Sequence, residues 1–234
     1  MVGGVGSPAR TLLNPNEPDA HALPATAPLY WEDACSFLAQ HDPVMELVIA
    51  THREGALSGS GVLFQTLVKA ITGQQISVLV ADRIWQRLHL LLPALSPEAT
   101  LATSTEDLRN TGLSWRKVEY IHGIAHALTS GAINPEGWPE MTDGAIKREL
   151  QQLRGIGPWT ADMVLIFYLQ RPDVLPLEDI GLINSAFNLY QWEDPGTPAS
   201  RRARVAAAGE RWKPYRTVAT WYIWRVLDAT PVIY

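Results

Sequence analysis

Cysteine is almost missing from this sequence, since Cys35 is the only one among 234 residues. One thiol cannot form an internal disulfide, and it cannot supply the several thiolates of an iron–sulfur cluster or a cysteine-based zinc site. A reducing compartment suits such a chain, so we expect a cytoplasmic protein.

Long hydrophobic runs are missing as well. No stretch of about eighteen residues is apolar enough to span a bilayer, so we expect no membrane partner. Residues 1–28 are rich in glycine, proline and alanine and have neither the basic cluster nor the apolar segment of a signal peptide. We expect these residues to be a flexible leader before one domain at 29–234.

An excess of positive charge is also lacking. The formal net charge of −5 argues against a protein that coats nucleic acid non-specifically, although one face can still be basic. The C-terminal part contains a group of basic residues that could form either a solvated surface or a surface that contacts phosphates. Its members are Arg201, Arg202, Arg204, Arg211, Lys213, Arg216 and Arg225. A hydrophobic content of 47% with 9 tryptophans indicates a globular protein with a substantial core.

Apolar residues recur mainly at helical spacing. The stretch 63–92 contains two such stripes separated by Gly73, and they comprise Phe64, Leu67, Val68 and Ile71, then Ile76, Val80, Ile84 and Leu88. Helix-start signals stand at Ser96, Ser104, Ser114 and Thr142. A further apolar stripe over residues 215–226 predicts a final helix, with Trp221 and Trp224 on its other side.

A glycine-containing turn lies between two predicted helices at residues 153–161, Leu-Arg-Gly-Ile-Gly-Pro-Trp-Thr-Ala. Gly155 and Gly157 permit positive φ or close backbone approach, and Pro158 suits the first turn of the next helix. Uncovered N–H groups at that helix start could bind an anion such as phosphate. The alternative is an ordinary helical hairpin that ends in a glycine cap.

Asp179 lies about twenty residues after this turn, just before another predicted helix. Aspartate is a favoured N-cap, so a purely structural role is one interpretation. The other is catalytic, because a helix N-terminus stabilises a charged carboxylate and such a carboxylate can stabilise an oxocarbenium-like sugar.

Taken together, these motifs resemble the helix-hairpin-helix DNA glycosylase superfamily, and within it the 3-methyladenine glycosylases of the second type. The resemblance extends over about Gly61 to Trp224 and depends on the hairpin with Asp179 and on three further motifs. These are Gln-Gln-x-Ser at residues 74–77, Gly-Leu-Ser-x-x-Lys at residues 112–117, and a closing segment of residues 212–216 followed by Ile223-Trp224.

The resemblance implies an all-α helix-hairpin-helix fold with two helical lobes flanking an active-site cleft and no N-terminal β-domain. It implies a monomeric, monofunctional DNA glycosylase in base excision repair, nucleoid-associated in a bacterium. Its partner would be double-stranded DNA containing alkylated purines such as 3-methyladenine and 7-methylguanine. A non-catalytic helix-hairpin-helix protein that binds DNA damage remains the alternative, because it would share the hairpin.

The resemblance also implies roles for individual residues. Asp179 is the expected catalytic residue, and Trp159, Trp224 and Met163 are expected to line the base pocket. The expected DNA-binding residues are Gln74, Gln75, Ser114, Lys117, Gly155, Gly157 and Thr160. No cofactor is expected to be required, but backbone carbonyls of Gln151, Leu153 and Ile156 could hold a structural Na⁺ or K⁺.

Three positions depart from the family's patterns. Relatives that also cut the DNA strand carry a lysine where this chain has Trp159, so we expect no lyase chemistry. Gln75 occupies the position of an apolar wedge in the best-known bacterial member, and Met163 replaces an aromatic pocket residue. The range of bases that the protein accepts therefore stays open.

Overall fold

The computed structural model describes residues 27–226, so the predicted leader lies outside the described residues except for its last two positions. Residues 27–226 form helices and connecting segments with no strand, which confirms the all-α prediction for this part of the chain. Within the same range no helix is both long and apolar enough to cross a membrane.

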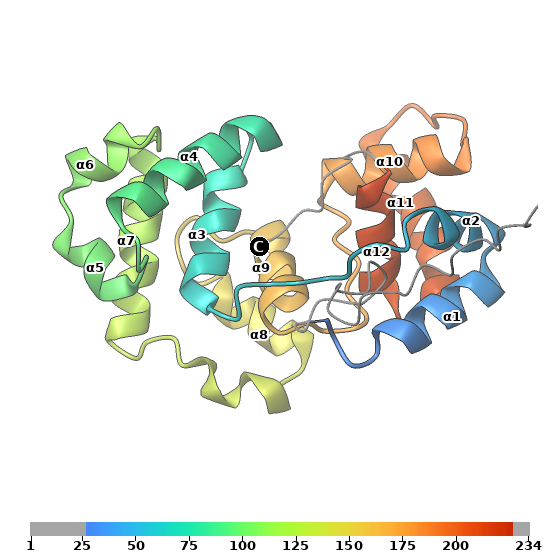
Figure 1. Cartoon of the computed structure of the whole chain (residues 1–234), viewed down its shortest axis with the longest axis horizontal. Helices are drawn as coiled ribbons and strands as arrows, with labels where there is room; N and C mark the ends of the chain where they lie inside the picture. The colour runs from blue at the N-terminus through green and yellow to red at the C-terminus, as the bar shows by residue number, and fades with distance from the viewer. Residues whose placement is uncertain (1–26, 227–234) are drawn as a thin grey trace, which may run out of the picture.

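The helices form two lobes, which Figure 1 shows side by side. The first lobe consists of α3 Leu63–Gly73, α4 Val78–Leu91, α5 Pro97–Ala102, α6 Thr105–Asn110, α7 Trp115–Thr129, the 3-10 turn η1 Pro135–Glu140, α8 Asp143–Leu150, α9 Pro158–Met163 and the π-helical turn η2 Val164–Tyr168. The second lobe consists of α1 Trp31–His41, α2 Pro43–Thr51, α10 Ile180–Tyr190, α11 Pro198–Gly209, the 3-10 turn η3 Glu210–Trp212 and α12 Arg216–Arg225. Helices from both ends of the described chain therefore share one lobe.

Side-chain caps explain where several of these helices begin. Each capping oxygen accepts a backbone N–H from the first turn, as predicted for Ser96, Ser104, Ser114 and Thr142. Asp42 caps α2 in the same way and is only 1% exposed, because Tyr190 and Trp212 also donate hydrogen bonds to its second oxygen. This one carboxylate therefore ties α2 to two segments near the C-terminal end of the described chain.

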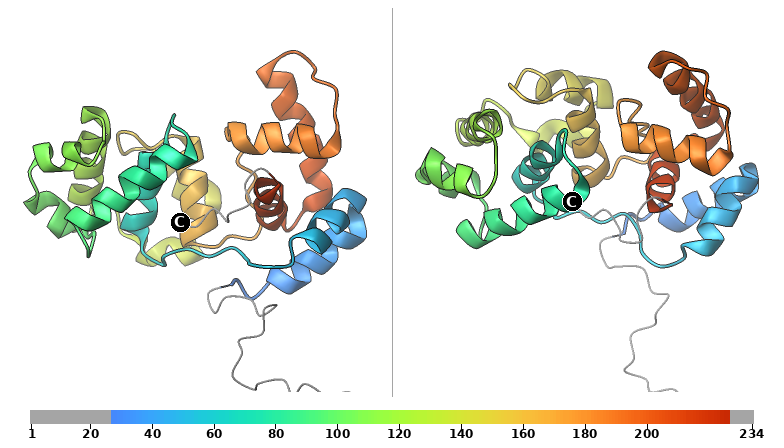
Figure 2. Two further views of the ribbon diagram at one scale, coloured as in Figure 1. Left: turned by 45° about the horizontal axis from the view of Figure 1, so that its top comes forward. Right: turned by 90° about the horizontal axis from the view of Figure 1, so that it is seen from above.

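Two segments connect the lobes, residues 52–62 and residues 169–179, and the first is visible in cyan in Figure 2. Thr217 of α12 anchors the second segment. Its hydroxyl donates to the carbonyl of Arg171 at 2.6 Å and accepts the N–H of Val174 at 3.0 Å. The chain that leads to Asp179 is therefore fixed on the second lobe before it reaches α10.

Helices α8 and α9 form the predicted hairpin. A partly buried ion pair joins them, in which Lys147 Nζ lies 2.6 Å from Oδ1 of Asp162. Burial raises the pKa of Asp162, which is 4% exposed, and the Lys147 ammonium opposes that rise. The pair stabilises the packing of the two helices behind the glycine turn.

The second helix of the hairpin begins at Pro158 as predicted, but it does not continue as a regular α-helix. After Met163 it widens into η2, where the N–H of Leu169 bonds to the carbonyl of Val164. The wide turn places Phe167 against Trp224 of α12, with nearly parallel rings 5.9 Å apart. This stack packs the first lobe against the second.

Candidate active site

Asp179 is the N-cap of α10, and both of its carboxylate oxygens have donors. Oδ1 accepts the backbone N–H of Leu182 at 2.6 Å, and Oδ2 accepts the indole N–H of Trp159 at 2.7 Å. The carboxylate is partly exposed, so it combines a fixed orientation with access from outside. Each oxygen keeps a further lone pair, which allows the group to face a developing cation or to orient a water molecule.

Gly181 is a supporting residue for this carboxylate that we did not predict from the sequence. A Cβ added at Gly181 would lie 2.9 Å from Oδ1 of Asp179, closer than real Cβ contacts allow. The glycine therefore leaves the space that the capping carboxylate occupies. The one sequence feature that could have indicated this role is its position two residues after a capping aspartate.

The three predicted pocket residues come from both lobes. Trp159 and Met163 lie one helical turn apart in α9, and Trp224 lies in α12. Met163 is 1% exposed and Trp224 is 9% exposed, whereas Trp159 is partly exposed. Because α12 is buried along its length, Trp221 is a core residue that packs edge-on against Trp31.

Glu178, the carboxylate next to Asp179, has a different environment. Its side chain is 53% exposed and lies 3.8 Å from Arg202 of α11. Exposure and a cationic neighbour make it a surface ion pair, which contributes little to stability. Of the two adjacent carboxylates, only Asp179 is held by directed donors.

The hairpin turn contains two glycines in different conformations. Gly155 has a φ of +90°, and a Cβ there would overlap the ring of Tyr120. Gly157 has an extended backbone with a φ of −95°, and among the described residues no heavy atom beyond its chain neighbours lies within 4 Å of a Cβ built on it. Gly155 is therefore required by the fold, while Gly157 leaves open space at the N-terminus of α9.

The loop between α3 and α4 contains Gln74 and Gln75. Gln75 is exposed and has a φ of +58°, which is uncommon for a residue other than glycine. Gln74 instead donates through Nε2 to the carbonyl of Gly155 and to the hydroxyl of Thr160, each at 2.9 Å. Of the two glutamines that we expected to bind DNA, Gln74 therefore has its partners within the protein. One of these partners is Thr160, which is 1% exposed.

The other two predicted DNA-binding residues lie in the first turn of α7 and its cap. Ser114 accepts the N–H of Lys117, and the Lys117 ammonium donates to the carbonyls of Thr72 and Gln74, each at 2.8 Å. Burial lowers the pKa of Lys117. The structure thus brings α7, the loop after α3 and the hairpin together, and Lys117 lies at their junction.

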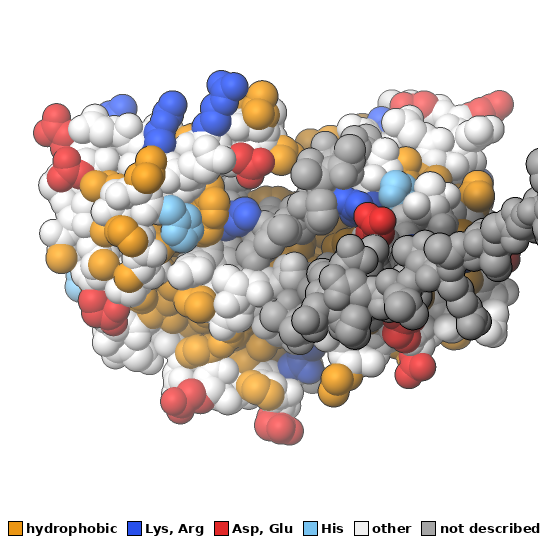
Figure 3. Space-filling model, in the orientation of Figure 1, with side chains coloured by type: hydrophobic (Ala, Val, Ile, Leu, Met, Phe, Trp, Pro, Cys, Tyr) orange, Lys and Arg blue, Asp and Glu red, His pale blue; other side chains and the backbone are white. Residues whose placement is uncertain are grey.

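Most of the basic group of the C-terminal part is paired with acids, and three of these acids lie more than twenty residues away in the sequence. Ion pairs join Arg201 to Asp194, Arg202 to Glu178, Arg211 to Asp42 and Arg216 to Asp173, and Lys213 pairs with the nearby Glu210. Sequence neighbours alone suggested a stripe with few acids. In the space-filling view, Lys and Arg side chains are also visible on the upper edge of the first lobe, beside hydrophobic ones (Figure 3).

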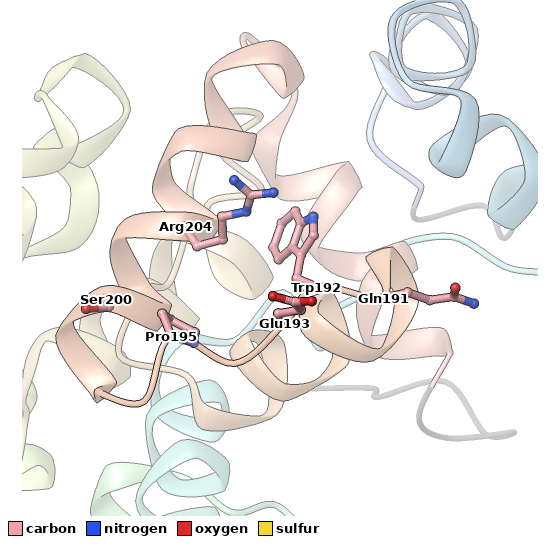
Figure 4. Close-up of a pocket in the computed structure, with 6 residues that line it drawn as sticks. All are labelled: Gln191, Trp192, Glu193, Pro195, Ser200 and Arg204. Carbon is pink, nitrogen blue, oxygen red and sulfur yellow. The ribbon is translucent and has the colours of Figure 1, made fainter.

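A separate hollow of about 560 Å³ lies at the far end of α10 (Figure 4). Its lining residues are Gln191, Trp192, Glu193, Pro195, Ser200 and Arg204. The Arg204 guanidinium lies over the Trp192 ring at 5.0 Å. Because the 11 residues of α10 span roughly 16 Å, this hollow is separate from Asp179 and is not the predicted base pocket.

Comparison with known proteins places this geometry among DNA repair proteins. The model of the family described as HhH-GPD superfamily base excision DNA repair protein matches residues 68–212, a range that includes the hairpin and Asp179. DNA-3-methyladenine glycosylase 1 of Schizosaccharomyces pombe is 32% identical over 69% of this chain and 71% of its own length. A DNA-3-methyladenine glycosylase of Bacillus subtilis is 30% identical over 81% of this chain.

A solved structure is also similar. The S. pombe 3-methyladenine DNA glycosylase in complex with abasic DNA matches with a TM-score of 0.73 and 28% identity, covering 82% of this chain and 95% of that one. In sequence, the chain spans 59% and 65% of the lengths of two B. subtilis relatives. The helical fold therefore extends over most of the S. pombe structure but over only part of these two longer proteins.

The two hairpin glycines lead to opposite predictions for stability. Gly155→Ala should lower the free energy of unfolding by about 2–4 kcal/mol, because alanine disfavours this φ and its methyl group meets Tyr120. Gly157→Ala should lower it by less than about 1 kcal/mol. Urea unfolding of both variants measures this difference.

A second substitution separates the two causes of the Gly155 effect. Tyr120→Ala in the Gly155→Ala background should recover part of the lost stability relative to the sum of the single changes, because it removes the steric overlap but not the backbone strain. Equal stability losses in Gly155→Ala and Gly157→Ala would contradict the assignment.

Proposed function

Because the chain belongs to the HhH-GPD superfamily of base excision DNA repair proteins, we propose that it is a monofunctional glycosylase that removes alkylated purines from double-stranded DNA. The observation that carries the proposal is the Asp179 carboxylate, which two N–H donors orient beside the hairpin. Relatives named as 3-methyladenine glycosylases support this class of substrate.

The proposed reaction begins with extrusion of the damaged nucleotide. Unstacking costs a few kcal/mol and costs less for a damaged base, which contributes to selectivity. The hairpin N–H groups around Gly157 bind the DNA backbone, where the open space leaves room for a phosphate. The freed base then enters a pocket bounded by Trp159, Met163 and Trp224.

The chemistry of the lesion suits this pocket. Alkylation at N3 or N7 of a purine leaves a positive charge on the base, which favours an aromatic face by about 0.5–2 kcal/mol. The same charge makes the base a good leaving group, so little help from a general acid is needed. As the glycosidic bond breaks, Asp179 stabilises the cationic sugar or orients the attacking water, and hydrolysis leaves an abasic site.

The hairpin also suits a structural monovalent cation, which is part of the proposal. Carbonyl oxygens are appropriate ligands for a hard cation, and those of Gln151, Leu153 and Ile156 lie in the turn between α8 and α9. The Leu153 carbonyl accepts the N–H of Ile156 at 3.2 Å and keeps its second lone pair. A bound Na⁺ or K⁺ would stabilise the turn that presents the N–H groups.

The first experiment tests catalysis by Asp179. Wild type should release 3-methyladenine or 7-methylguanine from methylated duplex DNA, and Asp179→Asn should reduce the rate by at least about a hundredfold while still binding an abasic-site duplex. Glu178→Gln is the matched control, because it neutralises the adjacent carboxylate, and it should keep most of the activity.

The outcomes separate the proposal from its alternative. Binding by every variant without any base release would favour a non-catalytic damage-binding protein. Equal release by wild type and Asp179→Asn would remove Asp179 from the catalytic role.

Trp159 has two proposed roles, and a phenylalanine substitution separates them. Trp159→Phe keeps an aromatic ring for the base but removes the donor to Oδ2 of Asp179. We expect the single-turnover rate to fall by about tenfold or more, because a hydrogen bond to a charged group is lost, with little change in affinity for an abasic-site duplex. A variant that loses affinity and keeps its rate would assign Trp159 to binding alone.

Lyase chemistry is tested by borohydride reduction during turnover. A lyase forms a Schiff base between a lysine and the sugar, and reduction traps the protein on the DNA. Because residue 159 is tryptophan, we expect no trapped complex under conditions in which base release is complete. A covalent complex at the level of an authentic lyase control would show that another amine performs this step.

A further inference from the structure

The loop after α3 and the first residues of α4 form an exposed tip, residues 75–80, that is mostly apolar. Side chains 75–80 are all exposed, and the apolar members Ile76, Val78, Leu79 and Val80 are 37%, 55%, 63% and 43% exposed. They lie at the N-terminal end of α4, which Figure 1 shows on the side of the first lobe that faces the second. To enter a stack of DNA bases, an apolar tip of this kind needs a firm attachment to the rest of the protein.

Lys117 fixes the protein segment from which the tip projects. Its ammonium lies 2.8 Å from the carbonyl oxygens of Thr72 and Gln74, which belong to the last turn of α3 and the residue after it. A cation at this position satisfies carbonyls that the helix leaves unpaired and interacts favourably with the helix dipole. Two of the three ammonium N–H groups are used in these bonds.

Gln74 fixes the same segment to the hairpin. Its side-chain amide donates to the carbonyl of Gly155 and the hydroxyl of Thr160, so the start of the loop is bonded to the hairpin turn and to the first turn of α9. Lys117 bonds to the backbone of this same residue. The contacts therefore form one continuous connection from α7 through the loop to the hairpin.

We propose that Lys117 is a positioning residue, which fixes the loop of residues 74–77 relative to the hairpin so that the apolar tip meets the base stack when the hairpin binds the DNA backbone. This inference rests on the proposed glycosylase function. It differs from the sequence-based expectation that Lys117 binds DNA directly. The distinction matters because the two roles have different experimental signatures.

A phosphate contact and a positioning contact differ in salt dependence and in substrate dependence. Removing a lysine that contacts phosphate lowers the slope of log affinity against log salt by about 1 and weakens binding to all sequences alike. Removing a lysine that positions the tip leaves this slope unchanged. It impairs base release only when the lesion must first be extruded from a paired stack.

The experiment compares Lys117→Met on two duplexes, one with the alkylated base paired and one with the same base in a bulge. For the paired lesion we expect the single-turnover rate to fall by about 10- to 100-fold, since the tip offsets part of the unstacking cost. For the bulged lesion we expect a change of less than about threefold, because extrusion is already assisted. The salt slope of binding should match that of wild type.

Two further variants make the result specific. Arg116→Met removes the same charge from the adjacent exposed position, and it should leave the ratio of paired to bulged rates at the wild-type value. Gln74→Leu removes the bonds to the hairpin, and it should reproduce the paired-lesion defect of Lys117→Met. A salt slope lowered by about 1 in Lys117→Met, with an unchanged ratio of rates, would overturn the inference in favour of a phosphate contact.

A measurement without DNA tests independently of activity whether Lys117 fixes the loop. Amide hydrogen exchange of residues 74–77 should be faster in Lys117→Met than in wild type and unchanged in Arg116→Met, while the core of α7 keeps its protection. If no variant releases any base, the proposed function fails, and this exchange still decides whether Lys117 fixes the loop. Unchanged exchange in residues 74–77 would overturn the positioning role.

Discussion

The hydrogen bond from the Trp159 indole to the Asp179 carboxylate is the contact on which the candidate site depends. Trp159 lies in the first turn of α9 in the first lobe, and Asp179 caps α10 in the second. One carboxylate therefore joins the start of two helices from two lobes. Displacing either lobe would break this bond, so the orientation of the proposed catalytic carboxylate depends on how the two lobes are placed relative to each other.

Local features of the site and fold could be predicted from the sequence because local rules determine them. A serine, threonine or aspartate at a helix start needs only its own next three residues to act as a cap, and Ser96, Ser114, Thr142 and Asp179 do so. The breaks after Gly73 and around Gly155 likewise follow from intrinsic backbone preferences. Apolar periodicity predicts the helices for the same reason.

The remaining features depend on partners far away in the sequence. Nothing near Lys117 indicates that its ammonium will meet carbonyls more than forty residues earlier, and nothing near Arg216 indicates Asp173. The widened turn at 164–168 is similar, because it accompanies the stacking of Phe167 on Trp224, a residue far along the chain. Resemblance to a family singled out Lys117 and Trp224, but only the structure separates a side chain bonded within the protein from one that faces outward.

The polar contacts of the site gather at helix ends for a physical reason. A helix leaves four N–H groups at its start and four carbonyls at its end without internal partners, so these are the points where side chains or ligands must supply bonds. At the end of α3 the partner is Lys117, and at the start of α10 it is Asp179. At the start of α9, Gly157 leaves the backbone open, and in the proposed function a DNA phosphate takes that place. Binding through uncovered N–H groups needs no large cationic face, which reconciles a net charge of −5 and the paired arginines of the second lobe with DNA as the proposed partner.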